Sequence, residues 1–247
     1  MSVRTQAAKR FRDNIRRSNE LHKVYLEDPV FLESYDRFAN WQLDFLLPFF
    51  DDLHRQDGYR EALDFTMSDL AGVGISQRDQ DLERAAPVIT RMLPTGALVT
   101  ISVAAEMNAR VLKLNTGICR CLMDNGALPE KITVREYVLA CRAASTLEEC
   151  VELVHVITDL GRTLSKLVHV PMIGITLRTM RGPANAAGFG ALQAFLETGY
   201  TRFKAIPDVE LFLDIIDTRM VGVFEGIFGL PLAELDVASL LETISTI

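Results

Sequence analysis

Apolar residues recur along this chain at the three- and four-residue spacing of α-helices, and no segment keeps the two-residue alternation of a β-strand. The first apolar stripe lies on a basic segment that ends before Pro29, and it consists of Ala7, Phe11, Ile15, Ser18, Leu21 and Tyr25. We therefore predict an all-α protein, a single-domain bundle of about nine or ten helices. Residues 1–28 are expected to form a basic amphipathic N-terminal helix, and residues 29–247 a single all-helical domain.

Short local signals predict where individual helices begin and end. Thr133 with Glu136, and Thr146 with Glu149, match the capping box, in which a hydroxyl and a carboxylate satisfy free N–H groups of a first turn. Asn125–Gly126 is typical of a helix C-terminus. The helices predicted from such signals include residues 59–70, 76–92, 97–124, 147–169, 172–181 and 184–206.

The composition is that of an ordinary globular protein, since 49% of the 247 residues are hydrophobic and 24% are charged. Four cysteines are too few for a disulfide framework, and Cys119 and Cys121 lack the two-residue gap of a zinc-binding pair. We expect packed thiols in a reducing compartment. The longest apolar stretch, residues 97–105, is far shorter than the roughly 20 residues that span a bilayer. These features predict a cytoplasmic protein.

Charge is distributed unevenly along the chain. Residues 1–23 carry a net charge of +5, which leaves −12 for the remaining 224 residues. An acidic surface repels phosphate, so we expect no nucleic-acid partner. The first helix is the part suited to a polyanion, and it can either contact an anionic membrane peripherally or dock on its own acidic body.

A first candidate for chemistry is the polar face of the helix that begins near Thr146. Glu152, His155 and Asp159 follow one another at spacings of three and four residues, so they share a face. Glu152-x-x-His155 is half of the pattern used by carboxylate-bridged di-iron bundles, and the chain has no second Glu-x-x-His. A solvated polar face is the main interpretation, and a metal site is the alternative.

A second candidate is a group of opposite charges around the predicted start of the helix at residue 76. Asp69, Arg78, Asp79 and Asp81 could form an acid–base or binding cluster, because neighbouring carboxylates separate each other's pKa values. The alternative is structural, since acids stabilise a helix N-terminus and arginine clamps a carboxylate.

Glu106 is a third candidate, because its sequence neighbours are apolar and a buried carboxylate there would be unusual. Arg110 lies four residues further along, at the spacing of a helical ion pair. A salt-bridged surface or interhelical stripe is therefore the alternative interpretation of this residue.

The segment from residue 172 to 195 combines a predicted helix break with small residues. Gly182–Pro183 is expected to end one helix just after the basic Arg178 and Arg181. The next helix is expected to contain Gly188 and Gly190, which cost helix stability and so imply close approach of another group. That group is either a neighbouring helix or an apolar ligand in a groove.

Two segments carry a resemblance to a known family. Phe65-Thr66-Met67-Ser68-Asp69-Leu70-Ala71-Gly72 is followed by Ser76-Gln77-Arg78-Asp79-Gln80-Asp81-Leu82-Glu83-Arg84, with its serine, Arg-Asp and Asp-x-x-Arg pattern. In these segments the chain resembles the bacterial FFLEELY-motif proteins, a family of helical proteins. The resemblance implies a bacterial, cytosolic, helical protein and supplies no reaction.

Taken together, the sequence favours a non-catalytic helical binding or adaptor protein without a cofactor. Its partner is expected to be a protein, an anionic surface or a hydrophobic small molecule. A metal-dependent or carboxylate-based enzyme is one alternative. A structural subunit or homo-oligomer is another, and it would use the apolar face that contains Phe212, Ile216 and Phe224.

Overall fold

The computed structural model describes residues 1–69, 76–126 and 132–245, and this part of the chain is all-α, with no strand. It contains eleven α-helices longer than one turn, so the predicted count of nine or ten is too low; short helices give only weak periodic signals. The elements are α1 (Val3–Leu26), α2 (Pro29–Leu46), η1 (Leu47–Phe50), the single turn α3 (Asp51–His54), α4 (Tyr59–Asp64), the π-helical η2 (Phe65–Asp69), α5 (Ser76–Met92), α6 (Thr95–Asp124), α7 (Val134–Ala144), α8 (Leu147–Val168), α9 (Pro171–Ala186), α10 (Gly190–Lys204), α11 (Val209–Gly229) and α12 (Val237–Ser245).

The predicted helix ends at the centre of the chain are confirmed. Both capping boxes form: the Thr133 and Thr146 hydroxyls accept the backbone N–H groups of Glu136 and Glu149, whose carboxylates accept N–H groups in return. Asn125 is the C-cap of α6, which is why this helix ends where the sequence indicates.

The predicted break at Gly182–Pro183 is wrong. Helix α9 continues through both residues to Ala186, because a proline in the last turn removes only one intrahelical hydrogen bond. The chain reverses instead at Gly188, whose φ of +77° only glycine adopts without strain, and the Phe189 N–H donates to the Ala184 carbonyl at 2.8 Å. Consequently Gly188 precedes α10, and Gly190 is the first residue of that helix.

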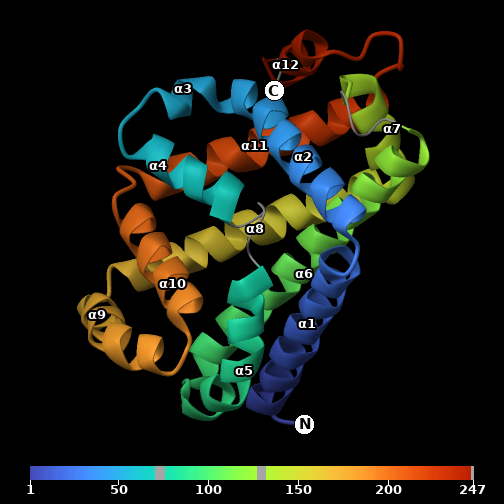
Figure 1. Cartoon of the computed structure of the whole chain (residues 1–247). Coiled ribbons are helices and arrows are strands. Elements are labelled where there is room, and N and C mark those ends of the chain that lie inside the picture. Colours follow the sequence, from blue (N-terminus) through green and yellow to red (C-terminus); the bar gives the residue numbers. More distant parts are fainter. Residues whose placement is uncertain (70–75, 127–131, 246–247) are drawn as a thin grey trace.

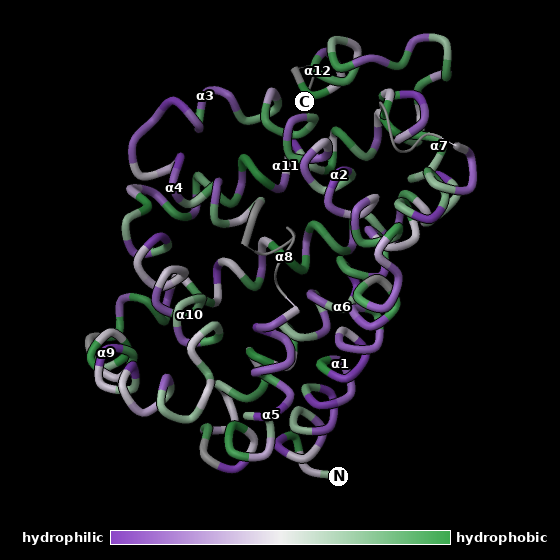
Figure 2. The backbone as a smooth tube through the Cα atoms, in the orientation of Figure 1, coloured by the Kyte–Doolittle hydropathy of each residue, from purple (hydrophilic) through white to green (hydrophobic). Residues whose placement is uncertain are grey.

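The helices are arranged around α6 and α8, which cross the middle of the molecule (Figure 1). Helix α1 packs along α6 and α5, and α8 packs along α11. The α9–α10 hairpin forms one edge of the molecule, where hydrophobic residues appear along the α9 backbone (Figure 2). No helix in the described ranges is both long enough and apolar enough to traverse a bilayer.

Helix α1 is built into the body of the protein rather than projecting from it. Phe11 and Ile15 are buried against α5 and α6. The Arg4 guanidinium donates to the carbonyls of Thr90 and Leu93 at the C-terminus of α5, at 2.8 and 2.7 Å. The basic helix therefore docks on its own protein through its apolar stripe, while arginines such as Arg12 remain exposed.

The largest apolar core lies at the end of the molecule formed by α2, α4, α6, α7 and α11. Its centre is aromatic: the ring of Tyr137 lies 5.0 Å from Phe45 and 6.3 Å from Phe38, measured between centroids. Phe212, Ile216 and Phe224 of α11 belong to this core and are buried. The face that a structural subunit was expected to present is thus already covered.

Candidate functional site

A cavity of about 350 Å³ borders this core, in the part of the molecule that contains α1, α5, α9 and α10, called the cavity end below. Helices α1, α5, α6, α8, α9, α10 and α11, together with η2, all contribute to its walls. Most of the described residues that line it are apolar, including Ile15, Leu82, Ala105, Met107, Ile157, Leu160, Leu164, Ile173, Leu177, Leu192, Phe195, Leu196 and Phe203. A concave apolar site of this size is typical of small-molecule binding sites.

Three glycines let the helices around the cavity approach each other closely, and one of them is Gly161 of α8, where a Cβ atom would lie 2.7 Å from Leu213 of α11. A Cβ atom on Gly199 of α10 would lie 2.9 Å from the ring of Phe65, and one on Gly174 of α9 would lie 2.5 Å from the Tyr200 hydroxyl. These distances are shorter than atoms tolerate, so any larger residue would push the walls apart. The close approach that the sequence predicted does occur at Gly190, where a Cβ atom would lie 2.7 Å from Asn185 Oδ1 of α9, but not at Gly188.

The polar end of the cavity is formed by Arg78, Asp79 and Asn108. The Arg78 Nε donates to Asp79 Oδ1 at 2.9 Å, and its Nη2 donates to Asn108 Oδ1 at 2.7 Å. Asn108 Nδ2 donates in turn to Asp79 Oδ2 at 2.8 Å. The three side chains thus form a closed triangle of hydrogen bonds, with the guanidinium carbon 4.6 Å from the centroid of the Phe195 ring.

Residues of α1 extend this triangle into a buried network. His22 Nε2 lies 2.9 Å from Asp79 Oδ2, and Asn108 Nδ2 donates to Ser18 Oγ at 3.1 Å. Asn19 Nδ2 donates to the Asp79 carbonyl at 3.3 Å and to the Glu83 carboxylate at 2.5 Å. Because the exposed fractions of His22 and Asp79 are only 1% and 0%, each polar atom here needs a protein partner.

The electrostatics of the network favour an ionised Asp79. Burial works to raise the pKa of this carboxyl, but the hydrogen bond from His22 and the positive charge of Arg78 outweigh it and hold the pKa below its ordinary value. The carboxylate is therefore a fixed negative charge facing a fixed guanidinium, an arrangement suited to orienting a polar group.

Asp81 has a different role, because it fixes the α9–α10 hairpin against α5. Its Oδ2 accepts the backbone N–H of Leu192, in the first turn of α10, at 3.3 Å. Its Oδ1 accepts from Arg84 Nη2 at 2.5 Å, and the same nitrogen donates to the Gly188 carbonyl at 2.7 Å. The clamp holds in place two helices that line the cavity.

Among the residues proposed from sequence, Arg78, Asp79 and Asp81 are brought together, whereas the side chain of Asp69 lies outside the described part. Arg178 is exposed, and its Nε donates to the Gly174 carbonyl one turn earlier. Arg181 is exposed as well, and it forms a bidentate ion pair with Glu197 of α10. Both arginines belong to the outer surface of the hairpin.

Glu106 lies in an interhelical ion-pair chain. It pairs with Arg10 of α1 and, at 3.2 Å, with Arg110, which reaches Glu152 of α8 at 3.0 Å. The hydrogen bond from Arg10 is the main reason why the pKa of Glu106 is lowered. This is the salt-bridged stripe that the sequence allowed as an alternative, since Glu106 is only partly buried.

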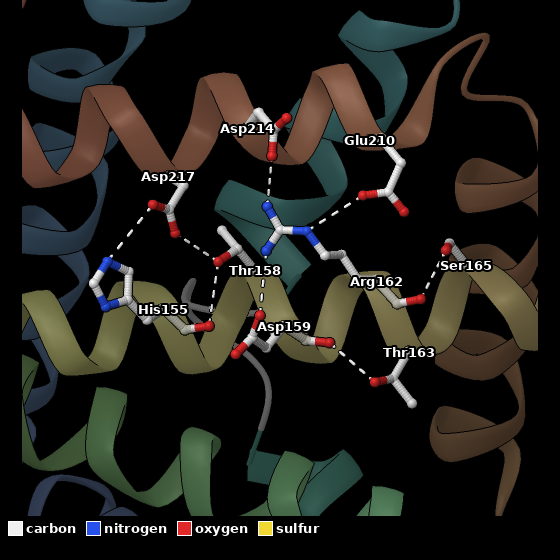
Figure 3. Close-up of polar contacts among 9 residues, drawn as sticks. All are labelled: His155, Thr158, Asp159, Arg162, Thr163, Ser165, Glu210, Asp214 and Asp217. Carbon is white, nitrogen blue, oxygen red and sulfur yellow. Dashed lines mark hydrogen bonds and ion pairs between the residues drawn. The ribbon is translucent and has the colours of Figure 1, made fainter. Parts of the chain in front are cut away.

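The polar face of α8 does not gather its candidate metal ligands. Glu152 pairs with Arg110. Figure 3 shows that His155 lies near Asp217 of α11, at 3.6 Å, and that Asp159 pairs with Arg162. Within the described ranges, no group of three or more His, Cys, Asp or Glu residues is placed to hold a metal ion.

Instead, the polar face of α8 joins that helix to α11. Arg162 contacts Asp214 at 2.6 Å and Glu210 at 3.3 Å, and the Thr158 hydroxyl donates to Asp217 at 2.7 Å (Figure 3). The Arg162 contacts bridge the two helices at the surface, and the contact of Thr158, which is buried, bridges them further inside. The face is therefore an interhelical polar seam.

The buried cysteines carry no reactive character. Burial raises the pKa values of Cys119 and Cys141 to about 12, so both are thiols at neutral pH rather than nucleophilic thiolates. Cys119, Cys121, Cys141 and Cys150 are all free, and three of them are buried. The expectation of packed thiols agrees with their positions.

Sequence reasoning missed Ser18, His22 and Asn108. A usable signal existed, because Ser18 lies on the apolar stripe of α1 and His22 follows it by one helical turn. Polar side chains on a buried stripe need buried partners, which could have suggested a network with the acids of α5. Asn108 gave no comparable signal.

Comparison with known proteins identifies the family. Residues 22–229 match the family described as Domain of unknown function (DUF8198). The chain belongs to this family. No curated protein and no solved structure matches it. The match begins at His22, so it covers the cavity-lining parts of η2, α5, α6, α8, α9, α10 and α11 but leaves out Phe11 and Ile15 of α1.

Proposed function

We propose that this protein binds a hydrophobic small molecule that carries one polar group, within the cavity between α1, α5, α6, α8, α9, α10 and α11. The observation that carries this proposal is the combination of an apolar space of about 350 Å³ with a buried polar end. The hydrocarbon part of the ligand contacts Leu160, Leu164 and Phe195, and the polar group lies near Arg78 and Asn108.

The geometry supports a small ligand better than a protein partner. A protein partner needs a broad exposed surface, whereas these side chains converge from eight elements on one concave space. The polar groups at its end are already hydrogen-bonded to each other, so they are held in place before any ligand arrives.

Titration with the fluorescent probe 1-anilinonaphthalene-8-sulfonate tests the proposal, because the probe joins an apolar ring system to one anionic group. We expect saturable binding to the native protein. Leu164→Trp fills part of the cavity and should weaken binding at least about tenfold, equivalent to about 1.4 kcal/mol. Equal affinity in the wild type and the variant, or no binding at all, contradicts the proposal.

Leu211→Trp is the matched control, since Leu211 is 49% exposed on α11 and does not line the cavity. It should bind the probe as the wild type does. Mass spectrometry of an organic extract of the purified protein then identifies any co-purified lipid, and Leu164→Trp should carry less of it.

The bacterial origin, the likeness to FFLEELY-motif proteins and a cytoplasmic location belong to this proposal as well. They rest on the sequence resemblance and on four free thiols, which fit a reducing compartment. A non-catalytic binding role is part of the same proposal, and detection of turnover of a bound compound would contradict it.

A further inference from the structure

Helix α9 and the first half of α10 lie in the longest part of the chain without acidic residues. Residues 160–196 contain no Asp or Glu, although the protein has 33 of them among 247 residues. The same 37 residues contain Arg162, Lys166, Arg178 and Arg181. In a chain with a net charge of −7, this segment is cationic in sequence, although Arg162 and Arg181 pair with carboxylates outside it.

Helix α9 also exposes apolar side chains on its outer face. Met172 is 64% exposed, Ile175 50% and Met180 47%. Their spacing places them on one side of the helix together with the exposed Thr176 and Thr179, and no charged residue lies among them. This group of five residues is called the outer face of α9 below.

The side of α9 that adjoins this face contacts the cavity. Ile173 and Leu177 line its wall, and so does Leu196 of α10, which is nevertheless 43% exposed. The cavity therefore reaches the surface of the molecule beside α9. A helix with an exposed apolar face thus separates solvent from an apolar binding space.

We propose that the outer face of α9 docks on an anionic phospholipid surface, with Met172, Ile175 and Met180 inserted at the level of the headgroups. An interfacial helix combines these features: an exposed apolar face, flanking arginine or lysine, and no acidic residue. Docking would place the open side of the cavity against the bilayer. It does not depend on whether the cavity holds a ligand.

The positive charge beside the outer face of α9 favours an anionic lipid surface, rather than a second copy of the chain, as its partner. Two copies docked through α9 would bring the exposed Arg178 of each chain into the same interface, and like charges at close range oppose association. Arg181 is compensated by Glu197, but the described residues provide no carboxylate partner for Arg178. An anionic headgroup supplies that missing charge.

Vesicle flotation tests the docking. The full chain is mixed with vesicles of phosphatidylcholine alone, or of three parts phosphatidylcholine to one part phosphatidylglycerol. We expect binding only to the anionic vesicles, decreasing with salt because the charges are exposed. The triple variant Met172→Ser, Ile175→Ser, Met180→Ser should bind at least about tenfold more weakly, since three apolar side chains no longer enter the interface.

A matched triple variant controls for lost surface hydrophobicity: Val30→Ser, Val88→Ser, Leu211→Ser changes three side chains that are 66%, 57% and 49% exposed elsewhere. It should bind anionic vesicles as the wild type does. Arg178→Gln should weaken binding less than the α9 triple variant. Thermal unfolding followed by circular dichroism verifies that all variants fold.

Several results would overturn the docking. The first is absence of binding to anionic vesicles, and the second is an equal loss of binding in both triple variants. The third is a loss of binding in the double variant Arg12→Gln, Arg16→Gln, on the exposed side of α1, without any loss in the α9 triple variant. A wild-type dimer in light scattering that the α9 variant converts to a monomer would assign the face to self-association. The α9 variant should still bind 1-anilinonaphthalene-8-sulfonate, which separates this test from that of the cavity.

Discussion

The interior of this protein is packed differently at its two ends. At the aromatic end, Phe38, Phe45 and Tyr137 pack ring against ring, and the surrounding aliphatic side chains complete one continuous core. At the cavity end, part of the wall is formed by residues of that same core, such as Phe212 and Ile216, whereas other apolar residues fall into smaller separate clusters, and a polar network replaces part of the core.

The difference suits the aromatic end to stabilising the fold and the cavity end to binding another molecule. Close packing of large rings yields dispersion and burial energy but leaves no room for another molecule. The cavity end gives up part of that energy, and its walls are held by hydrogen bonds such as those of Asp79 and Asp81. We expect substitutions to have different consequences at the two ends.

The largest expected contrast comes from the same substitution at both ends. Leu122→Ala in the aromatic end should cost about 4–5 kcal/mol of unfolding free energy, because Leu122 is 1% exposed and fully surrounded. Leu160→Ala, at the cavity wall, should cost about 2–3 kcal/mol, because that side chain already lacks neighbours on one side. Urea unfolding measures both, and equal costs would contradict the comparison.

Breaking the polar network should be the next largest effect. Asp79→Asn removes the charge that faces Arg78 and leaves donors without a full acceptor, at a cost of about 3 kcal/mol in unfolding free energy. Asp124→Asn, at an exposed position, is the control and should change stability little. A small cost for Asp79→Asn would mean that the network contributes no more than surface polar contacts.

The Asp79 carboxylate should also make the free energy of unfolding depend on pH in the acidic range. Because the folded protein lowers the pKa of Asp79, its contribution is fully present above the unfolded pKa of about 4 and is lost as pH falls below that value toward the folded pKa. The stability difference between wild type and Asp79→Asn should therefore shrink below about pH 4. Urea unfolding at a series of pH values measures it, and a constant difference would exclude this linkage.

The exposed polar seam between α8 and α11 should give the smallest effect. Arg162→Gln loses contacts to Asp159, Glu210 and Asp214, all largely exposed, and should cost about 0.5–1 kcal/mol. The cost should decrease in high salt, which screens exposed charges. Thermal unfolding at low and high salt measures this cost. A cost as large as that of Asp79→Asn would contradict the prediction that the contacts between α8 and α11 stabilise the protein less than the buried network does.

Local sequence signals succeeded where a helix end is determined by its own residues. Thr133 and Glu136 form their capping box because both partners lie within one turn. They failed at Gly182–Pro183, because a proline near a helix C-terminus costs little and the reversal depends on Arg84 and Asp81 from a distant helix. The hairpin position is thus decided partly by residues about a hundred positions away in sequence.

The sequence by itself determined the all-α class, the capping boxes and the basic, amphipathic character of α1, because each follows from residues within a few turns of one another. Only the tertiary structure decided that Arg78, Asp79 and Asn108 face one apolar space, that His22 joins them, and that Arg181 turns outward. Such facts depend on how separate helices pack, and the spacing of residues along one helix does not encode the position of the next.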